Sequence, residues 1–600
     1  MTPSPSSARA PRGLLPVLAL LVTVVISVTA LATAKGRWAV ALGDTDDAMR
    51  LVMVRDLASG RAGWFDVHVD RLQPPLGVDM HWSRLIDGAL VALQSLFGLF
   101  VPHAQAETLM RVVWPLLWIF PAAWAVMVIA RRLGAVNADF LGAVVLMVDI
   151  LMFSQWWPGR IDHHDVQITL ALIALAGAAA GGTGGAILAG VMTGLDVAVG
   201  LEALAFLAVI GAMIALRFAF DGRTVRQARA YGLSLALSSA GFYLVQTAPS
   251  RWGRAVCDAV GINLVVALLI AGVGLALAAG LAARRGALAR WGALALTGVA
   301  AAGAYALINP ACLHGPMGEV DPRIAPIWMS LINEMQPLVK NLGEINNSMA
   351  VSALVSMGLG VLAWIFIGLR AERRTFGWVI TGAVMLASAV LALKARRMAF
   401  YVGWFSVPLI AAAASLMAAR FRRWQLLIGA ALAVAFSPSS VTAGVTFLRK
   451  LHPPSVAQAR KAATEAKRQK LSSACSTNAA YRQLAALPPG RVLGEIDLGP
   501  FVLALTPHSA IAAPYHRMGW GILAANDALA AKPGPDEAAV RRLGVSYVLD
   551  CPARAYQMNH AGLGPQSLQV RLDENRPPAW LEPLSPPSAP IRVYRVKPLA

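Results

Sequence analysis

Acidic residues gather directly after the first apolar run of the sequence. Asp44, Asp46 and Asp47 fall within four consecutive positions, and carboxylates this close repel one another unless a positive group lies among them. A divalent cation with oxygen ligands commonly fills that role. The alternative is a solvated helix N-terminus, where acidic side chains interact favourably with the helix dipole. The spacing makes this segment a candidate metal site.

A second polar group lies in the segment WWPGRIDHHD, residues 156–165. Asp162, His164 and Asp165 supply carboxylates and imidazole, which are ligands for divalent metals, and Arg160 is suited to an anionic phosphate. The alternative is a belt of interfacial tryptophans with charges in headgroup water. If both acidic groups face the same side of a membrane, they favour one shared metal ion.

A third candidate is Glu334, which lies in the long polar loop 309–348 within the stretch PIWMSLINEMQP. By composition this is merely a loop, and a lone glutamate would carry little weight. Loops of this length without strong secondary structure are, however, often functional.

The composition places these residues on a membrane protein. The 600 residues are 57% hydrophobic and only 14% charged, and the apolar residues form repeated runs of about 20, enough to cross a bilayer. This excludes a soluble enzyme, a fibrous protein and a disordered chain. The net charge of +20 is what cytoplasmic loops rich in Lys and Arg would give, so no nucleic-acid partner is expected.

The apolar runs predict a polytopic α-helical protein with about 13 membrane spans. With the N-terminus inside, the short inside segments hold about twice as many Lys and Arg as the short outside ones, as the positive-inside rule requires. The first span is read as a retained anchor, although Ala32-Thr33-Ala34 also fits a cleavage site. The predicted spans are 14–34, 110–130, 140–154, 166–181, 184–199, 202–220, 231–248, 259–282, 291–308, 350–369, 376–393, 400–419 and 425–446.

Residues 85–101 are apolar enough to span, but a span there would invert the arginine bias. They are therefore predicted to form a helix that lies in the interface or packs on the bundle. The polar loops 35–109, 155–166 and 309–349 then share the outer face of a membrane domain, 1–448.

The tail, 449–600, differs in its sequence pattern from the membrane part. The short runs RVLGEI, FVLAL and VSYVLDC read as strands between Pro- and Gly-containing turns, which predicts a small α/β domain on the outer, periplasmic side. All four cysteines fall outside or at outer span ends. Cys475 and Cys551 flank the core of the tail and are suited to a disulfide there. No CxxC pair is present, so no structural zinc site is expected.

The sequence resembles the catalytic subunit of oligosaccharyltransferase, of the single-subunit bacterial and archaeal type, because it carries similar motifs in the same order along the chain. This is a GT-C glycosyltransferase with 13 spans and a C-terminal domain outside the membrane. The matching stretches are Asp46 ten residues before Asp56 of VRD, then WFD at 64–66, PLG at 75–77, GRIDHH at 159–164 and SLINEMQP at 330–337.

The resemblance implies roles for the polar residues. Asp46, Asp162 and His164 or Asp165 would hold a divalent metal, Mg²⁺ or Mn²⁺, which binds the pyrophosphate of a polyprenyl-linked sugar donor. Asp46 and Glu334 would orient the attacking acceptor. Arg397, with Arg396 as the alternative, falls where the family keeps an arginine on the donor phosphates, beside the phosphate role expected for Arg160. An arginine snorkelling at a helix end is the other interpretation of the Arg396-Arg397 pair.

Two departures from the family leave the acceptor open. His164 stands where the family has a carboxylate. In the tail, Glu495-Ile496-Asp497-Leu498-Gly499 occupies the place of the family's Trp-Trp-Asp-Tyr-Gly pocket, so Asp497 remains but both tryptophans are absent. Tyr515, His516 and Arg517 have no family counterpart and would either bind acceptor or cap a strand.

The expected function is transfer of a glycan from a polyprenyl-(pyro)phosphate donor to a protein, lipid or glycan acceptor at the periplasmic face of a bacterial inner membrane. The alternative is a GT-C transferase that uses a polyprenyl-monophosphate sugar to modify a lipid or surface polysaccharide. A transporter or flippase is disfavoured, because the ionisable residues Asp149, Asp196 and Glu202 lie near span ends.

Overall fold

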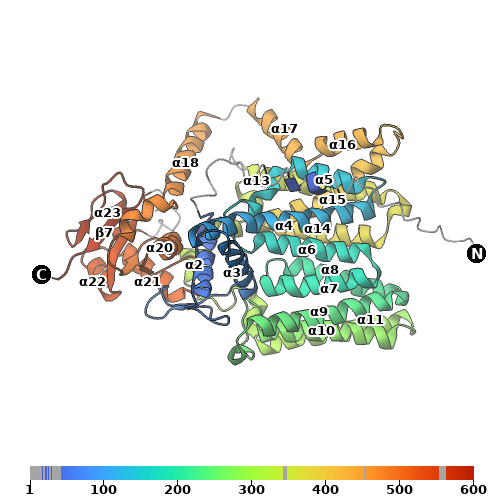
Figure 1. Cartoon of the computed structure of the whole chain (residues 1–600), viewed down its shortest axis with the longest axis horizontal. Coiled ribbons are helices and arrows are strands. Elements are labelled where there is room, and N and C mark those ends of the chain that lie inside the picture. Colours follow the sequence, from blue (N-terminus) through green and yellow to red (C-terminus); the bar gives the residue numbers. More distant parts are fainter. Residues whose placement is uncertain are drawn as a thin grey trace, which may run out of the picture.

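The computed structural model describes residues 42–341, 348–451, 455–552 and 563–599, together with isolated positions between 17 and 29. The predicted first span, 14–34, falls largely outside the described residues. Long helices lie side by side in one bundle, and the C-terminal domain lies at one end of it (Figure 1). The helices α2 and α3 lie between the two.

Each predicted span after the first corresponds to a helix or a pair of helices. Seven of the described helices are long and apolar enough to cross a membrane unbroken, and one bent pair meets the same test as a unit. The bundle helices are α4 (His103–Leu133), α5 (Ala138–Val148), α6 (His164–Ala180), α7 (Gly182–Val199), α8 (Leu204–Phe220), α9 (Val225–Gln246), α10 (Ile262–Ala282), α11 (Ala287–Ile308), α13 (Ser348–Gly368), α14 (Phe376–Lys394) and α15 (Ala399–Ala418).

The last predicted span is a bent pair rather than one helix. α16 (Gln425–Ala435) and α17 (Pro438–Lys450) meet at 50°. Pro438 has no N–H for a continuous helix and its ring fixes φ, so it suits the first turn of a new helix. The Ser437 side chain accepts the N–H of Ser440 and caps α17.

The centre of the bundle is α15, and its lipid-facing edge is α11. Nearly all of α15 is buried, including the small residues Ala411 to Ala414, which allow close approach of neighbouring backbones. α11 has no buried residue. An apolar helix that packs on α10 and leaves much of its surface exposed fits a position against lipid.

The first polar loop folds against the end of the bundle. It consists of α2 (Thr45–Ala58), a short hairpin of β1 (His68–Val69) and β2 (Val78–Asp79), and α3 (Arg84–Gly98). α3 covers most of the predicted interfacial segment 85–101 and packs on α2 and α4. Its far end exposes Leu96, Leu99 and Phe100.

The C-terminal domain contains a five-stranded sheet in the order β4-β3-β5-β7-β6. β3 pairs in parallel with β4 and β5, whereas β7 is antiparallel to β5 and β6. The strands are β3 (Arg491–Leu493), β4 (Ser509–Ala510), β5 (Val545–Asp550), β6 (Leu581–Pro583) and β7 (Arg592–Val596). The main helices are α18 (Val456–Ala474), α20 (Gly499–Leu505), α21 (Gly519–Ala530), α22 (Pro535–Arg542) and α23 (Leu568–Asp573).

The strand prediction for the tail is right in two places and wrong in one. RVLGEI contributes β3 and VSYVLDC contributes β5, but FVLAL at 501–505 lies in α20. Pro500 in the first turn of α20 favours a helix start. Periodicity alone does not separate such a short, fully buried apolar run from a strand.

Two disulfides and a shared core hold the extramembrane parts together. Cys475 pairs with Cys551, and Cys257 pairs with Cys312, a pair that the sequence did not indicate. One apolar cluster joins α2 and α3 to the C-terminal domain and includes Leu51 and Phe501. Backbone hydrogen bonds also link residues 71 and 73 to residue 510.

Candidate active site

A cavity of about 960 Å³ lies where the bundle, the first loop and the C-terminal domain meet. Its wall combines carboxylates, histidines and arginines with an apolar stretch from α8 and the loop before α13. The predicted site residues on this wall are Asp46, His164, Glu334, Arg397, Asp497, Tyr515, His516 and Arg517.

The three aspartates at the start of α2 have different roles. Asp44 caps α2 and accepts the backbone N–H groups of Asp46 and Asp47 at 3.0 and 3.1 Å. Asp47 is buried and accepts the N–H groups of Ile161 and Asp162 at 2.7 and 3.1 Å. Helix capping therefore accounts for Asp44. Asp47 ties α2 to the second motif, and Asp46 lines the cavity.

A buried ion-pair network fixes α2 against α3. Asp87 accepts Arg50 Nη1 at 2.8 Å and Arg84 Nη1 at 2.9 Å, and the Arg50 guanidinium lies 4.5 Å from the centre of the Trp82 ring. Arg50 Nη2 is also 3.9 Å from Asp162. Breaking a buried pair leaves an uncompensated charge, so this network holds the carboxylates of two loops in register.

Asp162 and the two histidines after it form the polar centre of the site. His163 Nδ1 lies 2.5 Å from Asp162 Oδ1, and His164 Nε2 lies 3.0 Å from Asp162 Oδ2. Ligand atoms from these three residues lie within 4.8 Å of one another. Both carboxylate oxygens of Asp162 are buried and face imidazole nitrogens, and together these atoms form a donor set that suits a divalent cation.

The electrostatics around Asp46 also favour a cation. Burial, followed by the charges of Asp162 and Asp44, raises the pKa of Asp46 well above its usual value. A bound divalent ion would offset both effects, because it favours the ionised carboxylate.

Glu202 connects the two sides of the site. Located between α7 and α8, it accepts His164 Nδ1 at 2.9 Å and Arg397 Nη1 at 2.6 Å. Burial raises the pKa of Glu202, but the charges of Arg397 and His164 outweigh this and leave the pKa well below its usual value. Glu202 therefore stays ionised and orients both partners.

Glu334 reaches the cavity from a loop made of short helical turns, among them η6 (Asn333–Met335). The loop is fastened to the bundle next to Arg397, because the N–H of Arg396 donates to the carbonyl of Gln336 at 2.9 Å. The Gln336 side chain in turn donates to the carbonyl of Ser330. These bonds place Glu334 and Arg397 on the same wall.

Four predicted site residues lie off the cavity wall, and one of them, Asp162, contacts His163 and His164, which line it. Arg160 pairs with Asp44 and, at 3.1 Å, with Asp47. Asp165 is buried and accepts the N–H of Val166. Arg396 is also absent from the lining. The structure thus gathers Asp46, Asp162, His164, Glu334 and Arg397, whereas Arg160 acts on the aspartates.

The candidate acceptor residues of the tail contact the membrane part directly. The Tyr515 hydroxyl donates to the carbonyl of Thr45 at 3.0 Å, beside Asp46. Arg517 donates to both oxygens of Asp258 at 2.6 and 2.7 Å. The segment therefore closes one side of the cavity, and it lies between β4 and α21 rather than capping a strand.

Sequence reasoning missed His163 as a candidate ligand and the bridging role of Glu202. The signal for His163 was present, since it adjoins His164 in the same motif. Glu202 lies at the outer turn between two predicted spans, on the same face as the acidic loops. This position in the sequence could have indicated that Glu202 belongs to the site.

Comparison with protein-family models gives no match, and comparison with curated proteins gives none. Comparison with solved structures does. The apo oligosaccharyltransferase of Archaeoglobus fulgidus aligns with a TM-score of 0.66 at 16% identity over 95% of this chain and 73% of that chain. The chain shares the fold of that protein.

Two further structures of the A. fulgidus protein agree. AglB in complex with an inhibitory peptide and a dolichol-phosphate aligns with a TM-score of 0.64 at 14% identity over 97% of this chain and 74% of that chain. The complex with Zn and sulfate gives 0.58 at 15% identity over 97% and 73%. The fold expected from the motifs is confirmed. At such low identity the likeness concerns the fold alone.

Proposed function

We propose that this protein is a membrane glycosyltransferase that moves a glycan from a polyprenyl-linked phosphate donor to an acceptor at the outer membrane face. One observation carries this proposal. Asp46, the Asp162-His164 pair and Glu334 come from three loops far apart in the sequence, and they converge on one cavity beside Arg397.

The donor set fits a divalent metal. Asp46, Asp162 and His164, with His163 beside them, would hold the ion, either Mg²⁺ or Mn²⁺; a Zn complex is known for the A. fulgidus neighbour. When bound, the ion would neutralise charge on the phosphate leaving group. Arg397, oriented by Glu202, adds a positive charge for the donor phosphate. Glu334 and Asp46 are placed to orient the acceptor or take its proton.

The donor and acceptor are proposed from the neighbours and from the wall of the cavity. The AglB neighbour was solved with a dolichol-phosphate and an inhibitory peptide, which favours a polyprenyl donor. On the acceptor side, Glu495 and Asp497 line the cavity, and no tryptophan stands in that segment. This absence favours, as a second candidate, a transferase that uses a monophosphate donor and a lipid or polysaccharide acceptor.

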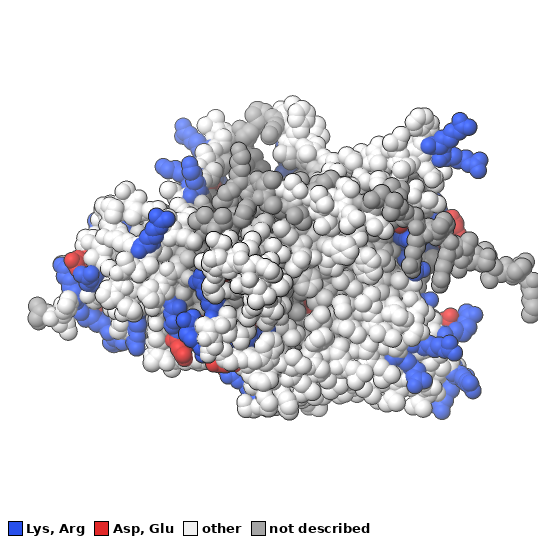
Figure 2. Space-filling model, viewed as in Figure 1, with Lys and Arg blue, Asp and Glu red and all other residues white. Residues whose placement is uncertain are grey.

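The proposed membrane arrangement follows from the helices and charges. Basic side chains lie at the end of the bundle away from the C-terminal domain and also on that domain (Figure 2), while the middle of the bundle carries few charges. This distribution fits 13 spans, with the N-terminus in the cytoplasm and residues 449–600 in the periplasm, in a bacterial inner membrane.

Substitution of the three carboxylates tests the site. Asp46→Ala, Asp162→Ala and Glu334→Ala should each abolish transfer, measured with purified protein and a labelled polyprenyl-linked donor, while the protein still inserts and folds. Asp527→Ala, at an exposed position of α21 away from the cavity, is the matched control and should retain activity. Full activity in all three carboxylate variants would rule out the assignment.

The donor class is tested separately. The protein is supplied with mono- and diphosphate lipid-linked sugars and cell extract, with and without chelator, and the labelled product is identified by mass spectrometry. A labelled protein formed from the diphosphate donor supports the first candidate. A labelled lipid or polysaccharide formed from the monophosphate donor supports the second.

A further inference from the structure

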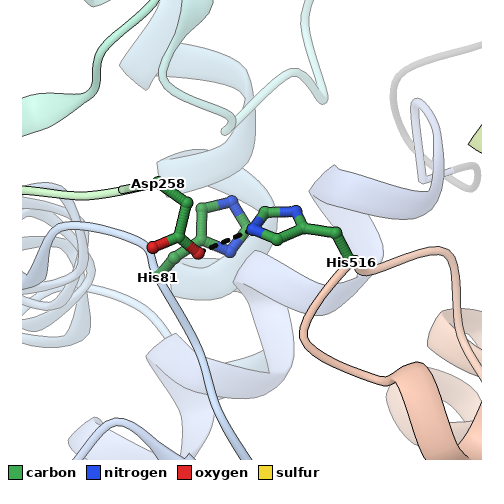
Figure 3. A group of neighbouring side chains, drawn as sticks. All are labelled: His81, Asp258 and His516. Atoms are coloured by element: carbon green, nitrogen blue, oxygen red, sulfur yellow. Dashed lines mark hydrogen bonds and ion pairs between the residues drawn. The ribbon is translucent and has the colours of Figure 1, made fainter. Parts of the chain in front are cut away.

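A second cluster of histidine and carboxylate side chains lies on the same cavity wall and shares no residue with the first (Figure 3). His81 precedes α3, Asp258 lies in the connection between α9 and α10, and His516 belongs to the C-terminal domain. Ligand atoms from these three residues lie within 4.8 Å of one another. The cluster therefore joins three separate parts of the fold.

The side chains face one another and are largely buried. His516 Nε2 lies 2.6 Å from Asp258 Oδ2, and these two side chains are only 10% and 9% exposed. The rings of His81 and His516 have their centres 4.6 Å apart. His81 Nδ1 is buried and has no hydrogen-bond partner among the described residues. A buried polar atom in that state is costly unless a ligand occupies it.

We propose that His81, Asp258 and His516 bind a second divalent cation, of the zinc type, that fastens the C-terminal domain to the membrane domain. Two imidazoles and one carboxylate are a donor set suited to Zn²⁺, with water in the remaining position. Ligand atoms around tetrahedral zinc lie about 3.3 Å apart. All three residues lie outside helices and strands, and His516 Nε2 and Asp258 Oδ2, now 2.6 Å apart, would have to separate by side-chain rotation to hold the ion between them.

The surroundings hold Asp258 in place. The Cys257–Cys312 disulfide immediately precedes it, and the Asn263 side chain bonds to the backbone N–H and C=O of Val256 at 3.3 and 3.1 Å. Metal-binding carboxylates are usually hydrogen-bonded by outer partners. Arg517 is such a partner of Asp258. A carboxylate has about four acceptor sites and the bidentate pair with Arg517 occupies two, so the other two remain for a metal ion.

The charge of Arg517 makes a prediction about metal affinity that a structural role alone would not make. Its positive charge opposes a cation at Asp258, so it lowers the affinity of the cluster for metal. A latch made only of hydrogen bonds would have no metal affinity for Arg517 to influence.

The test measures zinc binding rather than transfer. Tag-free, full-length protein in detergent is stripped with chelator, titrated with Zn²⁺ alone and desalted, and bound zinc is counted by mass spectrometry. We expect two zinc ions per chain for the wild type and one for both His516→Ala and Asp258→Asn. His314→Ala, which removes an exposed histidine outside both clusters, is the matched control and should still bind two.

Further variants separate this cluster from the first. Asp162→Asn should lose the other zinc ion and keep the one at His81, Asp258 and His516. Retention of one zinc ion by the His516 and Asp258 variants also shows that those chains are folded. Arg517→Gln should raise the affinity of the second site several-fold. Two zinc ions in His516→Ala, or loss of one in His314→Ala, would overturn the proposal.

Discussion

The two histidine–carboxylate clusters on the cavity wall are built in opposite ways. Asp162, His163 and His164 are consecutive residues at the start of α6, so their proximity is local. His81, Asp258 and His516 come from three segments and meet only when the C-terminal domain docks. The first cluster depends on one helix start. The second cluster forms only when the first loop, the connection between α9 and α10 and the C-terminal domain are packed together.

The largest expected difference between the clusters is in transfer. His164→Ala removes a proposed ligand and a partner of Glu202, so transfer should fall by about 100-fold or more. His81→Ala should reduce it much less, because Asp46, Asp162 and Glu334 keep their contacts. Initial rates with a labelled donor measure both. Equal losses would mean that the two clusters act as one site.

Removal of the Cys257–Cys312 disulfide should affect the second cluster selectively. The bond closes a loop of 55 residues, and loss of such a disulfide typically costs about 2–4 kcal/mol. The Cys257→Ser/Cys312→Ser variant should unfold at lower temperature and bind zinc more weakly at Asp258. The Cys475→Ser/Cys551→Ser variant is the comparison, since it should lower stability without a specific effect on that zinc.

Loss of the ion pair between Arg517 and Asp258 should have a smaller effect, which is on the free energy of unfolding. Arg517 is about one-fifth exposed and Asp258 is nearly buried, so Arg517→Met should lower the free energy of unfolding by about 2 kcal/mol through the charge left unpaired. Denaturant unfolding measures this. Arg323→Met, at an exposed ion pair with Asp321, is the reference and should change stability much less, because solvent screens exposed ion pairs.

A pH dependence of stability is expected away from both clusters. In the C-terminal domain, burial and the neighbouring Asp550 raise the pKa of Asp573 to about 8. The folded state therefore favours the protonated form, and its stability should fall as pH rises from about 4 toward 8. Asp573→Asn should flatten this slope in thermal unfolding profiles. A slope unchanged by the substitution would place the titration elsewhere.

Much of the bundle could be predicted, because runs of about 20 apolar residues have one structural solution in lipid. The break before Pro438 and the helix at 501–505 were not predicted from the sequence, since both depend on a proline within an apolar stretch. The first cluster was partly predictable because Asp162 and His164 share a motif. The second was not, because His81 and Asp258 each stand alone in the sequence and only the docked tail brings His516 to them.

The shared core of the first loop and the tail has a consequence for biosynthesis. The Arg55 guanidinium donates to the carbonyl of Ala504 at 2.6 Å, across 449 positions of chain, and Leu51 and Phe501 belong to the same apolar cluster. Ribosomes release the N-terminal part first. The aspartate-bearing helix α2 therefore keeps part of its apolar face uncovered until α20, near the end of the polypeptide, has been translated.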